Sequence, residues 1–396
     1  MHRTSFGLPG GGMLLLTLSA LAAPPLAGQE VVESAAPRDA DLTLAEEPLL
    51  RVGIVDGPLE YIFGNVTGAV RLADGSVVVA DEQSGNLRRF DANGRHIWTS
   101  GRSGEGPGEY EGLRLLRNCP GAPLTVFDWN LDRITELDLD GNVLATRSLL
   151  AVGVRPYAGL ACAPDGRLVY KPWPDDLGAS YEKDLAEGDF YRWNTALMSV
   201  EGDNVATLRS GIPGAERIFL MPGNSGPRQW GKDMVYAPVG TGVWYGTADD
   251  YELEHLDWTG RVTRIARWAG PDLGVTDDQV DRYGEAWART YDDPASRRRF
   301  ERETWPDWRD DLPERLPAYE TLFASPDGGV WVKTFRWHAP GEELHLLDAN
   351  GVWLRRLAFP RGAVVLDIGP DWVLLSERNE LDIPTVALYE LEETGG

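Results

Sequence analysis

One pattern appears twice in this 396-residue sequence, and it constrains the fold more than any other feature. The stretches VVVADEQSGNLRRFDANGRHIW, which begins at Val77, and LTVFDWNLDRITELDLDGNVLA, which begins at Leu124, share one order of residue types. Each has a β-branched run, an Asp, then Asn and Arg, an apolar residue and a D-x-x-G turn. The turn residues Asp91 and Asp138 are 47 residues apart. Self-similarity at this period is typical of repeat architectures.

Three markers keep the same register along the chain. The D-x-x-G turn recurs at Asp91, Asp138, Asp257 and Asp348. Aromatic residues open an upstream strand at Phe63, Tyr110, Tyr157 and Tyr319, and the offset to the turn is 28 residues from Phe63, 28 from Tyr110 and 29 from Tyr319. A D-G pair lies between these two markers at Asp74, Asp165 and Asp327. Each unit therefore predicts four short strands, which is the organisation of a propeller blade.

A single four-stranded sheet cannot bury both of its faces, so the repeated units are expected to pack sheet on sheet around an axis. The counts of 45 Gly and 27 Pro agree with many short strands joined by turns, and 15 Trp supply material for a large core. We count six units, of which the last shows only three strands. The stretch LLRVGIV, from Leu49 to Val55, is expected to supply the missing strand and to close the ring.

The long step from Asp257 to Asp348 contains a helical segment in place of another turn. Thr276 is a good N-cap, and Val280, Tyr283 and Trp287 fall on one helical stripe. The sequence therefore predicts an all-β fold: a six-bladed β-propeller over residues 48–392, with a helical insertion over 276–317 between blades 4 and 5. We expect this insertion to lie over the tunnel face as a lid.

The N-terminus has the form of a targeting segment. A weakly basic start is followed by the short apolar run GMLLLTLSALAA and an A-x-A pattern, which together predict a signal peptide over residues 1–28. Residues 29–47 are acidic and rich in small residues, so we expect a flexible leader there. No later segment is apolar enough to cross a bilayer. The mature protein is therefore expected in the periplasm or outside the cell.

The formal net charge of −24 limits the partners. A chain this acidic repels phosphate backbones and anionic lipid surfaces, so we expect neither nucleic-acid binding nor membrane insertion. The partners that remain are a small molecule, a glycan, or a protein or peptide.

The repeated stretches resemble the NHL-type repeat, and the linker GRSGEGPGEYEG with the stretch LPAYETLFASPDGGVWV resembles the exported bacterial six-bladed β-propeller family. The resemblance covers about residues 48–392, and it is closest in the first two units. It implies the fold and an exported location. That family has no single agreed activity, so the function has to come from the site.

Candidate ligand-binding residues are placed where inner strands begin, at the mouth of the axial tunnel. The aromatic residues Tyr110, Tyr157 and Tyr319 occupy equivalent positions there, and packing between blades is the alternative role for them. Arg102 is the one residue of the glycine-rich loop that can direct a cation at a ligand. Arg114, on the inner strand GLRLLRN, completes the set.

Two repeated pairs and one cysteine pair have mainly structural interpretations. Asp81 and Asp128 are expected to accept turn N–H groups and to pair with Arg88 and Arg133 across their hairpins. Cys119 and Cys162 end neighbouring inner strands, so a disulfide is plausible in an exported chain; two buried thiols are the alternative.

No metal or catalytic signature is evident, so we expect no metal site and no cofactor. The stretch DWNLD mimics the start of a calcium loop but lacks the required Gly and Glu, and the five His are scattered. The leading hypothesis is a binding or interaction module for a small molecule, glycan or peptide at the tunnel mouth. The alternative is a metal-dependent hydrolase of the gluconolactonase-like kind, for which the inner strands offer Asn118 and Asp367.

Overall fold

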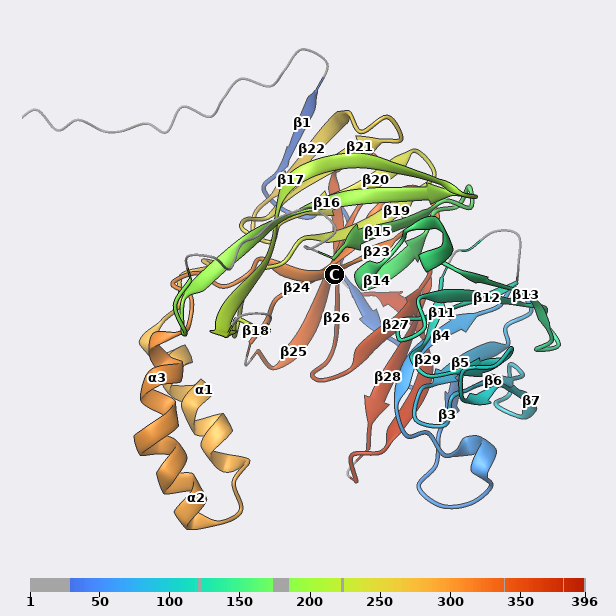
Figure 1. Cartoon of the computed structure of the whole chain (residues 1–396), viewed down its shortest axis with the longest axis horizontal. Helices are drawn as coiled ribbons and strands as arrows, with labels where there is room; N and C mark the ends of the chain where they lie inside the picture. Colours follow the sequence, from blue (N-terminus) through green and yellow to red (C-terminus); the bar gives the residue numbers. More distant parts are fainter. Residues whose placement is uncertain are drawn as a thin grey trace, which may run out of the picture.

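The computed structural model describes residues 29–117, 119, 123–173, 185–221, 224–337, 339–379 and 381–394. The predicted signal peptide over residues 1–28 and the candidate Asn118 lie outside these residues. Within them the chain is mostly β, and its sheets fan out around a common centre (Figure 1).

The first sheets are consecutive antiparallel meanders. One contains β4 (Val66–Arg71), β5 (Val77–Asp81), β6 (Asn86–Phe90) and β7 (His96–Ser100). The next contains β10 (Leu113–Leu116), β11 (Leu124–Asp128), β12 (Arg133–Leu137) and β13 (Val143–Ser148). A third contains β14 (Pro156–Cys162), β15 (Leu168–Pro172), β16 (Phe190–Glu201), β17 (Asn204–Met221) and β18 (Asn224–Pro227).

The remaining strands form further meanders of the same kind. One contains β19 (Val235–Val239), β20 (Gly242–Gly246), β21 (Glu252–Asp257) and β22 (Val262–Trp268). The next contains β23 (Tyr319–Ala324), β24 (Val330–Thr334), β25 (Gly341–Leu347) and β26 (Trp353–Pro360). The last contains β27 (Val364–Ile368), β28 (Trp372–Arg378) and β29 (Pro384–Glu393). Short pieces lie between sheets: β8 (Arg102–Ser103) with β9 (Glu109–Tyr110), and the 3-10 turns η1 (Leu59–Tyr61) and η2 (Leu150–Val152).

The hydrophobic cores lie between the faces of consecutive sheets. One cluster joins Val78 of β5 to Val126 of β11, and another joins Trp244 of β20 to Val332 of β24. A further cluster joins the last sheet to the first, because Leu374 of β28 packs with Val79 of β5. Each sheet therefore buries both faces against its neighbours, as the repeat requires.

The N-terminal segment adds three strands to sheets built by distant parts of the chain. β3 (Leu50–Val52) pairs antiparallel with β29, which is the partner predicted from the sequence. Residues 29–47, expected to be a flexible leader, instead contain β1 (Glu30–Ser34) and β2 (Leu42–Leu44). β1 pairs parallel with β22, and β2 lies between β26 and β29. The acidic composition did not prevent this, because open sheet edges supply backbone partners.

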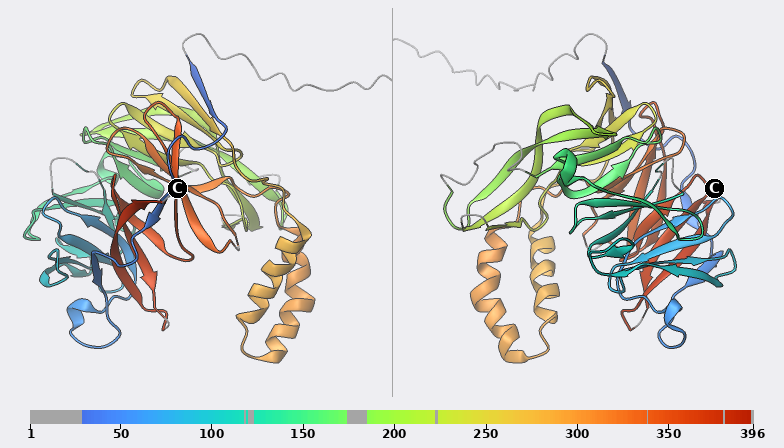
Figure 2. Two further views of the ribbon diagram at one scale, coloured as in Figure 1. Left: turned by 180° about the vertical axis from the view of Figure 1, so that it is seen from behind. Right: turned by 45° about the vertical axis from the view of Figure 1, so that its right-hand side comes forward.

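Helices lie between β22 and β23. They are α1 (Asp277–Arg289), α2 (Pro294–Arg299), the π-helical turn η4 (Phe300–Thr304) and α3 (Trp305–Asp310). Thr276 caps α1 with a full capping box formed with Gln279, so the predicted N-cap is confirmed. The helices extend away from the sheets in both views of Figure 2. The expected lid over the tunnel face is therefore wrong, since the buried stripe of α1 packs on α3 and on Trp230 and Trp337 at its base.

Candidate functional site

An axial cavity of about 630 Å³ is the place where all the sheets meet. Its lining comes from the first strand of each meander, namely β4, β10, β14, β19, β23 and β27. These strands run in the same direction around the axis, so the cavity has one end where they begin and one where they finish. The volume is within the roughly 300–1,000 Å³ typical of small-molecule pockets.

Polar side chains gather at the end where the strands begin. The ammonium of Lys171, which is buried, donates to Asp233 Oδ2 at 2.7 Å and to the carbonyl of Met234 at 2.9 Å. The hydroxyl of Tyr236 donates to the carbonyl of Gly159 at 3.1 Å. Burial raises the pKa of Tyr236, and the nearby charge of Asp233 raises it further. This hydroxyl therefore stays protonated and acts as a hydrogen-bond donor.

Arg114 lies beside this group. A Cβ placed on Gly159 would lie 3.6 Å from a guanidinium nitrogen of Arg114, so the arginine passes close to the β14 backbone. Among the described residues, Arg114 forms no hydrogen bond or ion pair, whereas the other cations of the cavity, Lys171 and Arg117, are both paired. The described lining therefore has an uncompensated positive charge at Arg114.

An ion pair and a disulfide lie at the opposite end of the cavity, where the strands finish. Arg117 Nη1 lies 3.4 Å from Asp367 Oδ1, and its guanidinium lies 4.8 Å from the ring centre of Phe323. Burial raises the pKa of Asp367, although Arg117 and the N–H groups of Arg71 and Ile368 oppose that shift. Cys119 and Cys162 form a disulfide with their Cα atoms 5.0 Å apart, so the bridged alternative is the one present in the structure.

The predicted tyrosines do not share one mouth. Tyr110 and Tyr319 are each 1% exposed and belong to cores between sheets. Tyr319 donates to the carbonyl of Glu252 at 2.7 Å, and burial raises the pKa of Tyr110 to about 12. The predicted placement of these two tyrosines in a ligand site is therefore wrong. Their aromatic rings fill the packing between sheets, which was the alternative role.

Tyr157 and Arg102 occupy different environments. Tyr157 is half-buried and lies between Trp173 and Trp193. Its hydroxyl accepts a hydrogen bond from Arg217 at 3.0 Å. The Lys171 ammonium lies 5.6 Å from its ring centre. Tyr157 therefore borders the polar end of the cavity. The Arg102 side chain is 80% exposed, pairs with Glu109, and does not line the axial cavity. Of the predicted ligand-binding residues, only Arg114 lines the axial cavity, and Tyr157 lies against the lining residue Lys171.

The repeated Asp residues hold turns, as predicted, but only one of the two expected ion pairs forms. Asp81 accepts the backbone N–H of Asn65 at 2.8 Å and pairs with Arg88 at 3.2 Å. Asp128 accepts the N–H groups of Glu111 and Gly112, both at 3.0 Å, and forms no ion pair with Arg133.

Strand register explains the difference between the two hairpins. Asp128 lies opposite Arg133, whereas Asp81 lies opposite Asn86, two residues before Arg88. Arg133 therefore reaches in another direction and donates to the carbonyls of Glu105, Gly106 and Glu109.

The described residues do not fit a divalent cation in the axial cavity. In the part of the chain that the structure describes, no three His, Cys, Asp or Glu side chains gather as metal ligands. Each axial carboxylate is already held by a cation: Asp233 by Lys171, Glu320 by Lys333 and Asp367 by Arg117. In the calcium-like stretch, the carboxylate of Asp128 already accepts backbone N–H groups, including those of Asn130 and Leu131.

The fold and the site define a mostly β protein whose sheets surround an axial cavity with one unpaired arginine in its described lining. No protein-family model and no curated protein sequence matches the chain. Among solved structures it is similar to a putative exported protein from Bacteroides fragilis, at 14% identity and a TM-score of 0.46, over 92% of this chain and 99% of that one.

Two further solved structures show similar values. A DUF4221 family member from Bacteroides vulgatus is 11% identical with a TM-score of 0.47, over 90% of this chain and 100% of that one. A gluconolactonase from Xanthomonas campestris is 12% identical with a TM-score of 0.39, over 90% and 99%. None of the helices in the described ranges has the length and apolar character needed to cross a bilayer.

Proposed function

We propose that this chain is an exported six-bladed β-propeller that binds a small molecule with an anionic group in its axial cavity. The observation that carries the proposal is Arg114, a cavity-lining cation that forms no hydrogen bond or ion pair among the described residues. Its charge contrasts with the formal net charge of −24 for the whole chain. An arginine that faces a pocket without a partner is suited to bidentate contact with a carboxylate or phosphate.

The six-bladed assignment is supported by the strand pairing. Each meander is taken as one blade, and β3 completes the last blade on the edge of β29. The NHL-like stretches form the first two blades. The helices from α1 to α3 are then an insertion between blades 4 and 5, because they lie between β22 and β23. Joining both ends of the chain in one blade removes the open edges that would otherwise invite aggregation.

Export is supported by the sequence of residues 1–28 and by the disulfide between Cys119 and Cys162. Disulfides persist in oxidising compartments and are rare in the cytosol. We therefore place the mature protein in the periplasm or outside the cell.

Neighbouring groups favour a small ligand over a long one. The ion pair of Arg117 and Asp367 occupies the other end, so we take the strand-start end as the approach to Arg114. Tyr236 and Lys171 flank that approach, so a bound anion is met by a guanidinium, with a phenol and a paired ammonium nearby. The apolar lining, which includes Leu115, Leu160 and Leu322, would cover the remainder of a molecule with an apolar body.

Thermal unfolding with added anions tests this function. The probes are acetate, lactate, succinate, citrate and inorganic phosphate, each compared with an equal concentration of chloride. A ligand at 100 times its Kd stabilises the native state by about 2.7 kcal/mol, so at least one probe should raise Tm measurably. Arg114→Ala should abolish that rise, and Arg114→Lys should retain part of it.

Arg102→Ala is the matched control, since Arg102 is exposed, pairs with Glu109 and lies outside the cavity. It should respond to the anions as the unaltered protein does. The function is wrong if no probe raises Tm, or if Arg114→Ala and Arg102→Ala respond alike.

A further inference from the structure

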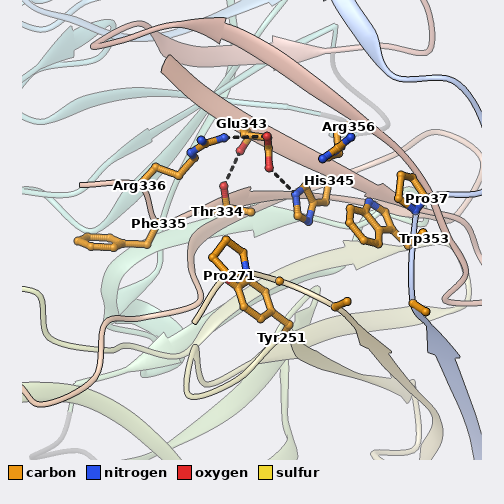
Figure 3. Close-up of a pocket in the computed structure, with 14 residues that line it drawn as sticks. Pro37, Tyr251, Pro271, Thr334, Phe335, Arg336, Glu343, His345, Trp353 and Arg356 are labelled. Atoms are coloured by element: carbon orange, nitrogen blue, oxygen red, sulfur yellow. Dashed lines mark hydrogen bonds and ion pairs between the residues drawn. The ribbon is translucent and has the colours of Figure 1, made fainter. Parts of the chain in front are cut away.

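A second cavity, of about 520 Å³, lies away from the axis between two neighbouring sheets. One wall comes from Tyr251 and from Ala269–Pro271 at the end of β22. The opposite wall comes from β24, β25 and β26. The segment Ala35–Pro37, between β1 and β2, crosses its margin (Figure 3). We call it the inter-sheet cavity.

A chain of hydrogen bonds fixes the polar wall of the inter-sheet cavity. The indole N–H of Trp268 donates to His345 Nδ1 at 3.0 Å. Because Nδ1 accepts, the proton of the neutral imidazole is on Nε2, which lies 2.7 Å from Glu343 Oε1 and donates to it. The ring of Trp353 lies 4.6 Å from that of His345 and holds it in place.

The carboxylate at the end of this chain stays ionised. Burial raises the pKa of Glu343, but the hydrogen bond from His345 and the charges of Arg336 and Arg356 lower it, and the pKa lies below its ordinary value. Arg336 Nη1 donates to the second oxygen of Glu343 at 2.7 Å. Each carboxylate oxygen therefore has one fixed donor and one lone pair left for a ligand.

The same cavity also presents unused donors. The hydroxyl of Tyr251 forms no hydrogen bond among the described residues, and Arg336 uses only one of its N–H groups on a described partner. Burial raises the pKa of Tyr251 to about 12, with the Glu343 charge adding to the shift, so the phenol keeps its proton. Figure 3 shows Tyr251 on the side opposite Glu343 and Arg336. Donors and acceptors thus face the cavity from two sides.

The charges of the inter-sheet cavity are balanced, unlike those of the axial cavity. Arg336 is matched by Glu343, and Arg356 is held by both carboxylate oxygens of Asp41. No surplus charge calls for an ionic ligand. A neutral molecule with several hydroxyl groups satisfies both the carboxylate lone pairs and the spare N–H and O–H donors. The aromatic ring of Tyr251 suits its C–H surfaces.

We infer that the inter-sheet cavity binds a neutral sugar, with Glu343, Arg336 and Tyr251 as its contacts. This site is separate from the anion site proposed at Arg114, and it does not depend on it. The segment Ala35–Pro37 completes the margin of the site, so the N-terminal segment has a role beyond pairing with sheet edges.

The test is saturation-transfer NMR and calorimetry with D-glucose, D-galactose, N-acetylglucosamine, maltose and cellobiose. At least one of these sugars should bind the unaltered full-length mature protein. Tyr251→Phe should weaken that binding about five- to tenfold, the value of one lost hydrogen bond. Its fold should be unchanged, since the hydroxyl has no partner among the described residues. Glu343→Gln should weaken binding at least as much.

Arg114→Ala separates this site from the axial one, because it should bind the sugar normally while losing the anion response. The inference is overturned if none of the five sugars binds, if Tyr251→Phe and Glu343→Gln both bind as the unaltered protein does, or if only Arg114→Ala loses the sugar.

Discussion

The guanidinium of Arg88 and the carboxylate of Asp81 form a buried ion pair, with Nη2 and Oδ2 3.2 Å apart. Arg88 also donates to the carbonyls of Leu59 and Ile62, so the pair fastens the loop before β4 to the hairpin of β5 and β6. Removing one member of a buried pair leaves the other charge without compensation.

We therefore predict that Arg88→Met lowers the free energy of unfolding by about 3–5 kcal/mol. The control is Arg95→Met, which removes an exposed pair with Asp91 and should cost at most about 1 kcal/mol. Urea denaturation followed by tryptophan fluorescence measures both. Equal losses in the two variants would contradict a special role for the buried pair.

The disulfide between Cys119 and Cys162 should account for a substantial part of the stability. It closes a loop of 43 residues, for which the chain-entropy model gives about 4 kcal/mol. The double variant Cys119→Ser with Cys162→Ser should lose stability of that order in urea. Alkylation of unreduced, denatured protein followed by intact-mass measurement checks the bond itself. Two alkylated thiols would show that the bridge is absent.

Stability should fall as the pH drops from about 6.5 to about 4, because of His255. Its ring nitrogens lie 3.1 Å from the hydroxyl of Thr241 and 2.7 Å from that of Thr263. Burial and the charge of Arg264 together lower the pKa of His255 to about 4. Between the two pKa values, His255 is protonated in the unfolded chain but neutral in the folded chain. The free energy of unfolding therefore rises with pH across this window.

The variant His255→Gln isolates this effect. It should remove a loss of about 3 kcal/mol between pH 6.5 and 4, although its stability at pH 7 is lower. Chemical denaturation at several pH values gives the slope. If the stability of His255→Gln depends on pH as steeply as that of the unaltered protein, another group causes the loss.

The helices should be removable without loss of the sheets. Gly274 pairs with Arg315 at their base, and Leu316 donates its N–H to the carbonyl of Leu273, so the two ends of the segment are already adjacent. Replacing residues 278–309 with a short Gly-Ser linker should leave a folded chain with the same disulfide. Its Tm should fall by several degrees because Trp230 and Trp337 lose Tyr283 as a neighbour.

Hydrogen exchange measures the outcome of that deletion directly. Protection in β19–β29 should match that of the full chain. Loss of protection in those strands would mean that the helices hold the sheets together.

The turns were predictable because their chemistry is local. Asp91 Oδ1 accepts the N–H groups of Asn93 and Arg95, both at 2.9 Å, and Gly94 has a φ of 79° that favours glycine. The equivalent bonds recur at Asp138, Asp257 and Asp348. A pattern of four residues thus fixes the turn without help from the rest of the chain.

The placement of β1 and β2 was not predictable, because these strands form only through pairing with distant strands. β1 bonds through its backbone to the edge of β22, and Leu42 is buried only because β2 reaches the groove between β26 and β29. An acidic segment rich in small residues has no periodicity that indicates such pairing. Composition indicates how a segment behaves alone, whereas here the open edges of distant sheets determine its structure.

The axial site was predictable only in part. Arg114 was found because it lies on a first strand, whose position the repeat fixes. Lys171 and Asp233 were missed because they are 62 residues apart, on β15 and just before β19, and meet only through the packing of two sheets. Tyr110 and Tyr319 were wrongly assigned to the ligand site. Residues at equivalent positions of a repeat usually serve the packing between its units.

The pairing of β2 and β3 with β29 sets the order in which the molecule can mature. β3 ends at Val52, yet its partner β29 spans Pro384–Glu393, so β3 can pair only after the sheets between them have been synthesised. A nascent chain therefore carries β3 without a strand partner until β29 has been synthesised, whereas β2 can already pair with β26. Removal of β29 would leave β3 without its strand partner and β2 paired with β26 alone.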